Sequence, residues 1–187
     1  MSVAKKSISG FSILAEFLLS TPATALEYGL DASFASSTQV DDWGASSHVQ
    51  IINSSGYGID LGYRYLNSIS YDALGSSLTH SLSQYEAALL WQTGARGFRL
   101  QTLLGGVWSN SWVQSNSQDV IAQYSPGYQA SLDLSVPVFT HIRAFADVGY
   151  QGWLNAEIPN HLTWRYGVRF IFGGNSVQKL ERQEQEE

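Results

Sequence analysis

Residues 162–172 read LTWRYGVRFIF, a stretch in which apolar and polar side chains alternate one by one. The even positions are Leu162, Trp164, Tyr166, Val168, Phe170 and Phe172, and the odd positions are Thr163, Arg165, Gly167, Arg169 and Ile171. A period of two residues is that of a β-strand, whose successive side chains point to opposite faces. The stretch therefore predicts a strand with one apolar face and one face that carries two arginines.

The same alternation recurs in residues 27–34, 57–66, 98–108, 128–136 and 142–151. One face of each strand is aliphatic and aromatic, and the other collects the charges. Over all the strands the charged face holds Glu27, Asp31, Asp60, Glu86, Asp133 and Asp147 together with Arg64, Arg99, Arg143, Arg165 and Arg169. Six carboxylates and five guanidinium groups are nearly balanced, which suggests that they pair with one another.

The distribution of lysine indicates which way the apolar faces point. In a soluble sandwich or lipocalin-like barrel the charged face would meet water, and solvated strand faces usually carry lysine. The chain has lysine only at Lys5, Lys6 and Lys179, outside the strand region. Arginine and carboxylate suit an enclosed space, because a guanidinium can bind two carboxylates at once. The pattern favours an all-β, membrane-spanning, antiparallel up-and-down β-barrel with a polar interior.

The N-terminal segment is typical of an exported protein. Lys5 and Lys6 precede an apolar run at residues 8–19, and Ala23-Thr24-Ala25 offers a cleavage site, so residues 1–25 are predicted to be a signal peptide. A transmembrane helix is the competing interpretation, but Glu16 interrupts the run and a span needs about 20 residues.

The 187-residue chain has no cysteine, so neither disulfides nor a thiolate metal site are expected. Removing residues 1–25 takes away two of its 10 basic and one of its 16 acidic side chains. The remaining charge of −7 argues against nucleic acid as a partner.

No apolar run of about 18 residues follows the signal peptide, so a mature chain that crosses a bilayer must do so as strands of a closed barrel. Eight strands are predicted at residues 26–35, 45–53, 57–67, 78–92, 98–111, 121–136, 141–153 and 161–172. A ten-stranded barrel remains an alternative. Tight turns are expected at 53–56, 93–97 and 137–140, on the periplasmic side. Mostly longer, polar connections are expected at 36–44, 68–77, 115–119 and 155–160, on the outer side.

Aromatic residues are expected to form two girdles where the barrel meets the membrane interfaces. The periplasmic set is Tyr28, Tyr57, Trp91, Phe98, Phe139, Phe170 and Phe172, and the outer set is Phe34, Trp43, Tyr65, Trp108, Trp112, Tyr150, Trp153 and Trp164. After the barrel (residues 26–172), residues 173–187 are predicted to be a polar periplasmic tail, rich in glutamate and glutamine and without aromatic residues.

The last predicted strand resembles the C-terminal sorting signal of outer-membrane barrels, through Arg165, Gly167, Phe170 and Phe172. The whole layout is similar to that of the small eight-stranded outer-membrane proteins of Gram-negative bacteria. The resemblance implies an outer-membrane location, lipid and lipopolysaccharide as neighbours, and barrel-assembly machinery as a partner during biogenesis. Members of that family usually end at the terminal aromatic residue, whereas this chain continues for fifteen residues.

An eight-stranded barrel has room inside only for side chains, so the interior charges are expected to form a salt-bridged plug. If the hairpin near Val138 is symmetrical, Asp133 lies opposite Arg143. Closure of the barrel brings Asp31 toward Arg165 or Arg169. A structural, envelope-integrity or surface-interaction role for a monomer is therefore predicted, and a narrow channel for ions or small solutes is the alternative.

A lipid A-modifying enzyme, either a deacylase or an acyltransferase, is the second alternative. The deacylases of this class use a His-x-Ser motif, but here Ser46 precedes His48, and His80 is followed by Ser81 and Ser83 at other spacings. The motif is not met, so no catalytic residues are predicted. No histidine pair suggests a metal, and no cofactor is expected. The ligand and the physiological role stay open.

Overall fold

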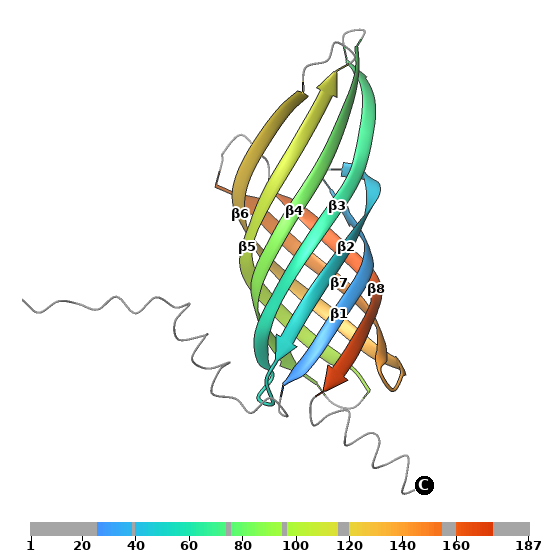
Figure 1. Ribbon diagram of the computed structural model, residues 1–187, viewed down its shortest axis with the longest axis vertical. Coiled ribbons are helices and arrows are strands. Elements are labelled where there is room, and N and C mark those ends of the chain that lie inside the picture. The colour runs from blue at the N-terminus through green and yellow to red at the C-terminus, as the bar shows by residue number, and fades with distance from the viewer. Residues whose placement is uncertain are drawn as a thin grey trace, which may run out of the picture.

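A computed structural model of the protein describes residues 26–38, 40–73, 76–94, 97–115, 120–154 and 160–173. Eight antiparallel strands follow one another around a closed barrel, as Figure 1 shows. The strands are β1 (Glu27–Ser37), β2 (Val40–Ile52), β3 (Tyr57–Ala73), β4 (Ser76–Thr93), β5 (Arg99–Ser115), β6 (Val120–Phe139), β7 (Ile142–Trp153) and β8 (His161–Gly173). The eight-strand prediction is confirmed and the ten-strand alternative is wrong. The predicted signal peptide and residues 174–187 lie outside the described residues.

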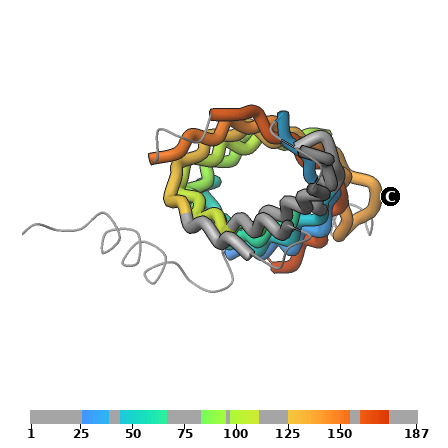
Figure 2. The backbone as a smooth tube through the Cα atoms, turned by 90° about the horizontal axis from the view of Figure 1, so that it is seen from above, coloured from blue at the N-terminus to red at the C-terminus, as the bar shows by residue number. Residues whose placement is uncertain are grey.

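The barrel closes where the first strand pairs with the last. β1 pairs with β8 antiparallel over the whole length of β1, from Glu27 opposite Gly173 to Ser37 opposite Thr163. The resulting ring is seen from above in Figure 2. β1 begins and β8 ends at the same end of the barrel, which is called here the terminal end. No helix among the described residues has the length and apolarity needed to cross a membrane.

The sheet has its apolar face outside and its charged face inside, as the alternation predicts and opposite to a soluble barrel. Leu132 is 50% exposed on the outside of β6, while the next residue, Asp133, is fully buried inside. On β8 the large side chains of Trp164 and Phe172 face outward and those of Arg165 and Arg169 face inward. An outer wall of large apolar side chains around a charged interior is the arrangement of a membrane-spanning barrel.

Five strands, β2 to β6, are longer than the apolar pattern predicts. β3 to β6 contain 17–20 residues and rise beyond the other four, which contain 11–13, as Figure 1 shows. The connections expected at residues 36–44 and 68–77 are therefore too long, because much of each is paired strand. The connection expected at 115–119 contains only one strand residue, Ser115, and residues 116–119 lie outside the described part of the structure. The apolar alternation marks the height of the membrane-facing band, whereas backbone pairing between neighbouring strands continues above it.

The turns at the terminal end have definite local causes. Between β2 and β3 the side-chain oxygen of Asn53 accepts hydrogen bonds from the backbone N–H groups of Ser55 (2.9 Å) and Tyr57 (3.0 Å), while Gly56 adopts a φ of 85°. An asparagine that binds the backbone two residues ahead, followed by glycine at positive φ, favours a tight turn.

The turn between β6 and β7 corrects one prediction. The turn lies at Thr140 and His141 instead of near Val138, and the register shifts by one residue between Pro137 and Phe139. Arg143 therefore lies opposite Pro137, and Asp133 lies opposite Asp147 instead of Arg143. Proline has no N–H to donate to the ladder and is therefore found at bulges and strand ends. The prediction assumed a symmetrical hairpin, and a register shift does not occur in such a hairpin.

The girdle prediction is wrong for one tryptophan. Trp153 is only 8% exposed and stacks inside the barrel on His161, with ring centroids 5.8 Å apart. Its odd position in β7 already places it on the inner face. Most of the other predicted girdle residues are exposed on the outside, and the side chains of Trp43 and Trp112 lie outside the described part of the structure.

Candidate functional site: the charged interior of the barrel

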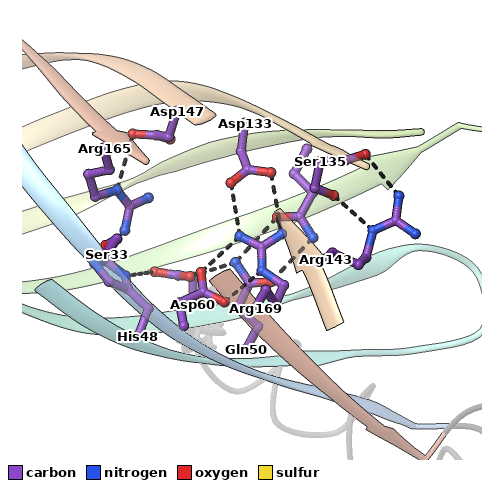
Figure 3. Close-up of polar contacts among 12 residues, drawn as sticks. Ser33, His48, Gln50, Asp60, Asp133, Ser135, Arg143, Asp147, Arg165 and Arg169 are labelled. Atoms are coloured by element: carbon purple, nitrogen blue, oxygen red, sulfur yellow. Dashed lines mark hydrogen bonds and ion pairs between the residues drawn. The ribbon is translucent and has the colours of Figure 1, made fainter. Parts of the chain in front are cut away.

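The structure brings the predicted charged residues together inside the barrel. Ten of the eleven are buried, and Arg99 is partly exposed. Together with His48 they form two groups, part of which Figure 3 shows. The terminal cluster, nearer the terminal end, consists of Glu27, Asp31, Arg99, Asp133, Arg143 and Arg169. The central cluster, farther along the barrel, consists of His48, Asp60, Arg64, Glu86, Asp147 and Arg165.

Arg169 is the centre of the terminal cluster. Its Nε and Nη2 donate to the two oxygens of Asp31, at 2.6 and 2.8 Å. Its Nη1 and Nη2 also donate to Asp133, at 3.3 and 2.9 Å, and Nη1 donates to Gln101 at 2.8 Å. The guanidinium carbon lies 4.7 Å from the centre of the Phe145 ring. One arginine therefore binds two buried carboxylates on two strands, and the five donors of a planar guanidinium suit this arrangement.

The other two arginines of the terminal cluster lie closer to the end of the barrel. Arg99 donates to both oxygens of Glu27, at 2.5 and 3.1 Å. Arg143 donates to the hydroxyl (3.1 Å) and the backbone carbonyl (2.8 Å) of Ser135. With three carboxylates and three guanidinium groups, the terminal cluster is balanced in charge.

The central cluster contains a histidine that the sequence did not single out as an interior group. His48 Nδ1 lies 2.7 Å from Asp60 Oδ1, and its Nε2 contacts Arg165 Nη1. Arg165 Nε donates to Asp147 at 3.2 Å, and Arg64 Nη2 lies 2.9 Å from Glu86 Oε1. Figure 3 shows Arg165 and Asp147 on one side of His48 and Asp60 on the other.

Glutamines join the clusters and continue the network. Gln50 Nε2 donates to Asp60 Oδ2 at 2.8 Å, and Gln50 and Gln101 exchange amide hydrogen bonds of 3.3 and 3.2 Å. Because Gln101 also accepts from Arg169, Gln50 and Gln101 together link the two clusters. Farther from the terminal end Gln84 donates to Gln151, which donates to Gln129, both at 3.1 Å. These glutamines were missed because they are uncharged, although their inward parity was a usable signal.

Many of these contacts span the interior. Glu27 on β1 meets Arg99 on β5, four strands away, which is the largest separation in a ring of eight. Gln84 on β4 meets Gln151 on β7, and Gln50 on β2 meets Gln101 on β5. Side chains that meet across the barrel occupy its centre, as expected for an eight-stranded barrel.

The residues considered for lipid chemistry do not face the membrane. His48 is 1% exposed, and Ser46 is buried with its hydroxyl 2.6 Å from that of Ser33 inside the barrel. The side chain of His80 lies outside the described part of the structure. Within the described residues, no group of three or more His, Cys, Asp or Glu side chains could hold a metal ion.

The four residues of the predicted sorting signal all lie on β8. Arg165 faces the interior, as does Gly167, which lies opposite Ser33. Phe170 and Phe172 face outward near the end of the strand and are 37% and 52% exposed.

The barrel is similar to those of small outer-membrane proteins of known structure. A major outer membrane protein from Thermus thermophilus matches with a TM-score of 0.66 and 12% identity, over 79% of this chain and 100% of that one. Ail, the attachment invasion locus protein of Yersinia pestis, matches with a TM-score of 0.52 and 12% identity, over 79% and 96%. The N-terminal barrel domain of Pseudomonas aeruginosa OprF matches with a TM-score of 0.53 and 18% identity, over 78% and 97%.

At these identities the likeness shows the fold alone. No protein-family model matches the sequence, and no curated protein matches it. The chain thus has the fold of the small eight-stranded outer-membrane β-barrels, with salt bridges buried in its interior.

Proposed function

We propose that the chain is an outer-membrane protein of a Gram-negative bacterium, with a structural or surface-interaction role and no catalytic activity. The observation that carries this proposal is the set of side chains that meet across the interior, above all Arg169 with its two carboxylates. Breaking a buried ion pair by removing one partner costs about 3–5 kcal/mol, so such a network is not easily opened. A closed, stiff barrel serves as an anchor for surface segments better than as a conduit.

The outer wall supports contact with lipid and lipopolysaccharide. Large apolar side chains such as Leu132, Leu104 and Val148 are half exposed there, and tyrosines and tryptophans accompany them. Each of the eight strands has a partner on both sides, so the closed part of the wall leaves no strand edge for a second copy, which supports a monomer. The outward Phe170 and Phe172 on β8 suit recognition by barrel-assembly machinery.

Heat-modifiability tests location and closure together. Outer membranes of cells that express the chain are extracted with detergent, and boiled and unboiled samples are compared on a gel. We expect the protein in the outer-membrane fraction, with a compact, faster-migrating band in the unboiled sample. A protein that stays in the soluble fraction and shows no shift contradicts the proposal.

Conductance in planar bilayers separates a closed barrel from a narrow channel. Because Arg169 and the Glu27–Arg99 pair lie across the interior, we expect no stable unitary currents from the purified protein. Stable currents that change in Asp147→Asn would favour the channel, because charged side chains that line an ion path determine its ion selectivity.

The enzyme alternative is tested by the mass of lipid A. We expect no change when the chain is overexpressed, because His48 and Ser46 are enclosed and cannot reach acyl chains. A changed mass that returns to normal on replacing His48 or His80 would contradict the non-catalytic proposal.

A further inference from the structure

The two charge clusters differ by one positive group. In the terminal cluster three carboxylates face three guanidinium groups. In the central cluster Asp60, Glu86 and Asp147 face only Arg64 and Arg165, and the sixth group is His48. The central cluster is balanced only when the imidazole carries its second proton. We propose that His48 is a proton-binding site, which exchanges Arg165 for Glu86 as its Nε2 partner when it takes up a proton.

The contacts in the structure define the neutral state of this site. Asp60 Oδ1 lies 2.7 Å from His48 Nδ1, and an ionised carboxylate can only accept, so Nδ1 carries a hydrogen. Nε2 contacts Arg165 Nη1, and because a guanidinium can only donate, Nε2 is the acceptor. An imidazole that donates at Nδ1 and accepts at Nε2 is neutral.

The same geometry provides a partner for the protonated state. A proton on Nε2 turns this nitrogen into a donor, which can no longer accept from Arg165. Glu86 Oε2 lies 3.9 Å from Nε2, so a small movement of that carboxylate completes a charge-assisted hydrogen bond. Arg165 keeps its bond to Asp147, and Asp60 keeps its bond from Nδ1. Protonation thus replaces the hydrogen bond from Arg165 to His48 with one from His48 to Glu86, and each charged group keeps a partner of opposite charge.

The other groups around His48 do not compete for this role. The charged groups that contact His48 or lie opposite it are Asp31 on β1, Asp60 on β3, Glu86 on β4 and Arg165 on β8. Their own partners in turn are Arg169 on β8, Arg64 on β3 and Asp147 on β7. Asp31 lies directly opposite His48 in the β1–β2 register, but both its oxygens bind Arg169. Arg64 lies beside Glu86, which it balances in the neutral state.

Gly62 makes room for the imidazole. It lies opposite His48 on β3, and a Cβ atom at this position would sit 2.2 Å from the ring carbon Cε1. The ring therefore packs directly over the glycine backbone. This holds its two nitrogens between Asp60 and the pair formed by Arg165 and Glu86.

Nuclear magnetic resonance of the imidazole nitrogens tests the site directly. The full chain, refolded in detergent micelles and shown to be folded by its fast unboiled migration, is labelled at its four histidines. The His48 signals are assigned by their loss in His48→Gln. We expect a neutral Nδ1–H tautomer at high pH that becomes a doubly protonated ring reversibly as the pH is lowered from about 9 to about 4. A His48 ring that keeps one protonation state throughout overturns the proposal.

Two matched carboxylate variants test the exchange of partners. In Glu86→Gln the protonated Nε2 loses its carboxylate acceptor while the side-chain volume is kept, so we expect proton binding at His48 to weaken about tenfold. Glu27→Gln, in the balanced terminal cluster, should leave proton binding at His48 unchanged. No change in Glu86→Gln, or an equal change in both variants, would show that Glu86 is not the partner.

Discussion

Both charge clusters are built from arginine, aspartate and glutamate, and the central cluster also contains His48. They differ in how many of their buried polar atoms have a hydrogen-bond partner. Every guanidinium of the terminal cluster donates to at least one acceptor by good hydrogen bonds, and Arg169 alone makes five. In the central cluster Arg64 Nε and Nη1 and Asp147 Oδ2 are buried without a hydrogen-bond partner among the described residues. The terminal cluster suits a permanent closure, whereas the central cluster has spare donors and acceptors through which contacts can change.

The largest expected effect comes from Arg169→Gln. It leaves Asp31 and Asp133 buried without their counter-charge, and removing one partner of a buried ion pair costs about 3–5 kcal/mol. The measurement is the free energy of unfolding from reversible urea titration in lipid vesicles. Arg143→Gln is the matched control in the same cluster, because the hydrogen bonds described for Arg143 go only to Ser135; about 1–2 kcal/mol is expected there. Equal losses in the two variants would contradict the central role of Arg169.

The same substitution in the two clusters sharpens the comparison. Asp133→Asn removes a charge that accepts two hydrogen bonds from Arg169, and we expect a loss of about 2–3 kcal/mol. Asp147→Asn removes one of three carboxylates from a cluster with only two guanidinium groups, and its described bond to Arg165 is a single one of 3.2 Å. We expect a loss of about 1 kcal/mol or less from that change. If Asp147→Asn is the more costly, the central cluster is the tighter of the two.

Gly62→Ala tests how closely the central cluster is packed. Its methyl group would overlap the His48 ring, and overpacking of this kind costs about 1–3 kcal/mol. The cost should fall by at least half in a His48→Ala background, which a double-mutant cycle measures. Gly106→Ala on the outside of β5 is the control, since a Cβ atom there meets only one backbone oxygen, at 3.8 Å. An undiminished cost in the His48→Ala background would mean that Gly62 is required for its backbone and not for the ring.

The sequence predicted the barrel because the two-residue period and the placement of charge agree on six of the eight strands. Leu132 and Asp133 are adjacent in the chain and lie on opposite sides of the wall, so one parity argument places both. Closure of β1 on β8 also predicted that Asp31 lies near Arg165 or Arg169, and the structure pairs it with Arg169. Such features can be predicted from the sequence, because they depend only on the alternation of side chains and on the order of the strands around the barrel.

Register and uncharged partners could not be predicted in the same way. The position of the turn at Thr140 and His141, two residues beyond Val138, places Arg143 away from Asp133, and a change of this kind alters which residues meet without altering the alternation along either strand. His48 was considered for catalysis and not for the interior, because a single histidine after two serines gives no sign of the carboxylates that surround it. Those carboxylates come from strands separated in sequence, so only the assembled barrel reveals them.

The smallest expected losses of stability come from replacing interior glutamines. Two substitutions compare Gln50, which lies between the two clusters, with Gln84, which lies farther from the terminal end. Gln50→Leu removes a donor to Asp60 and a link to Gln101, leaving a buried carboxylate oxygen with one bond fewer, so we expect a loss of about 1–2 kcal/mol. Gln84→Leu removes one bond to Gln151, and the carbonyl oxygen of Gln84 has no partner to lose among the described residues. A loss of about 0.5–1 kcal/mol is expected there, from the same urea titration. If Gln84→Leu costs more than Gln50→Leu, the glutamines far from the terminal end contribute more to stability than Gln50 does. The contact between the two clusters through Gln50 would then not be important for stability.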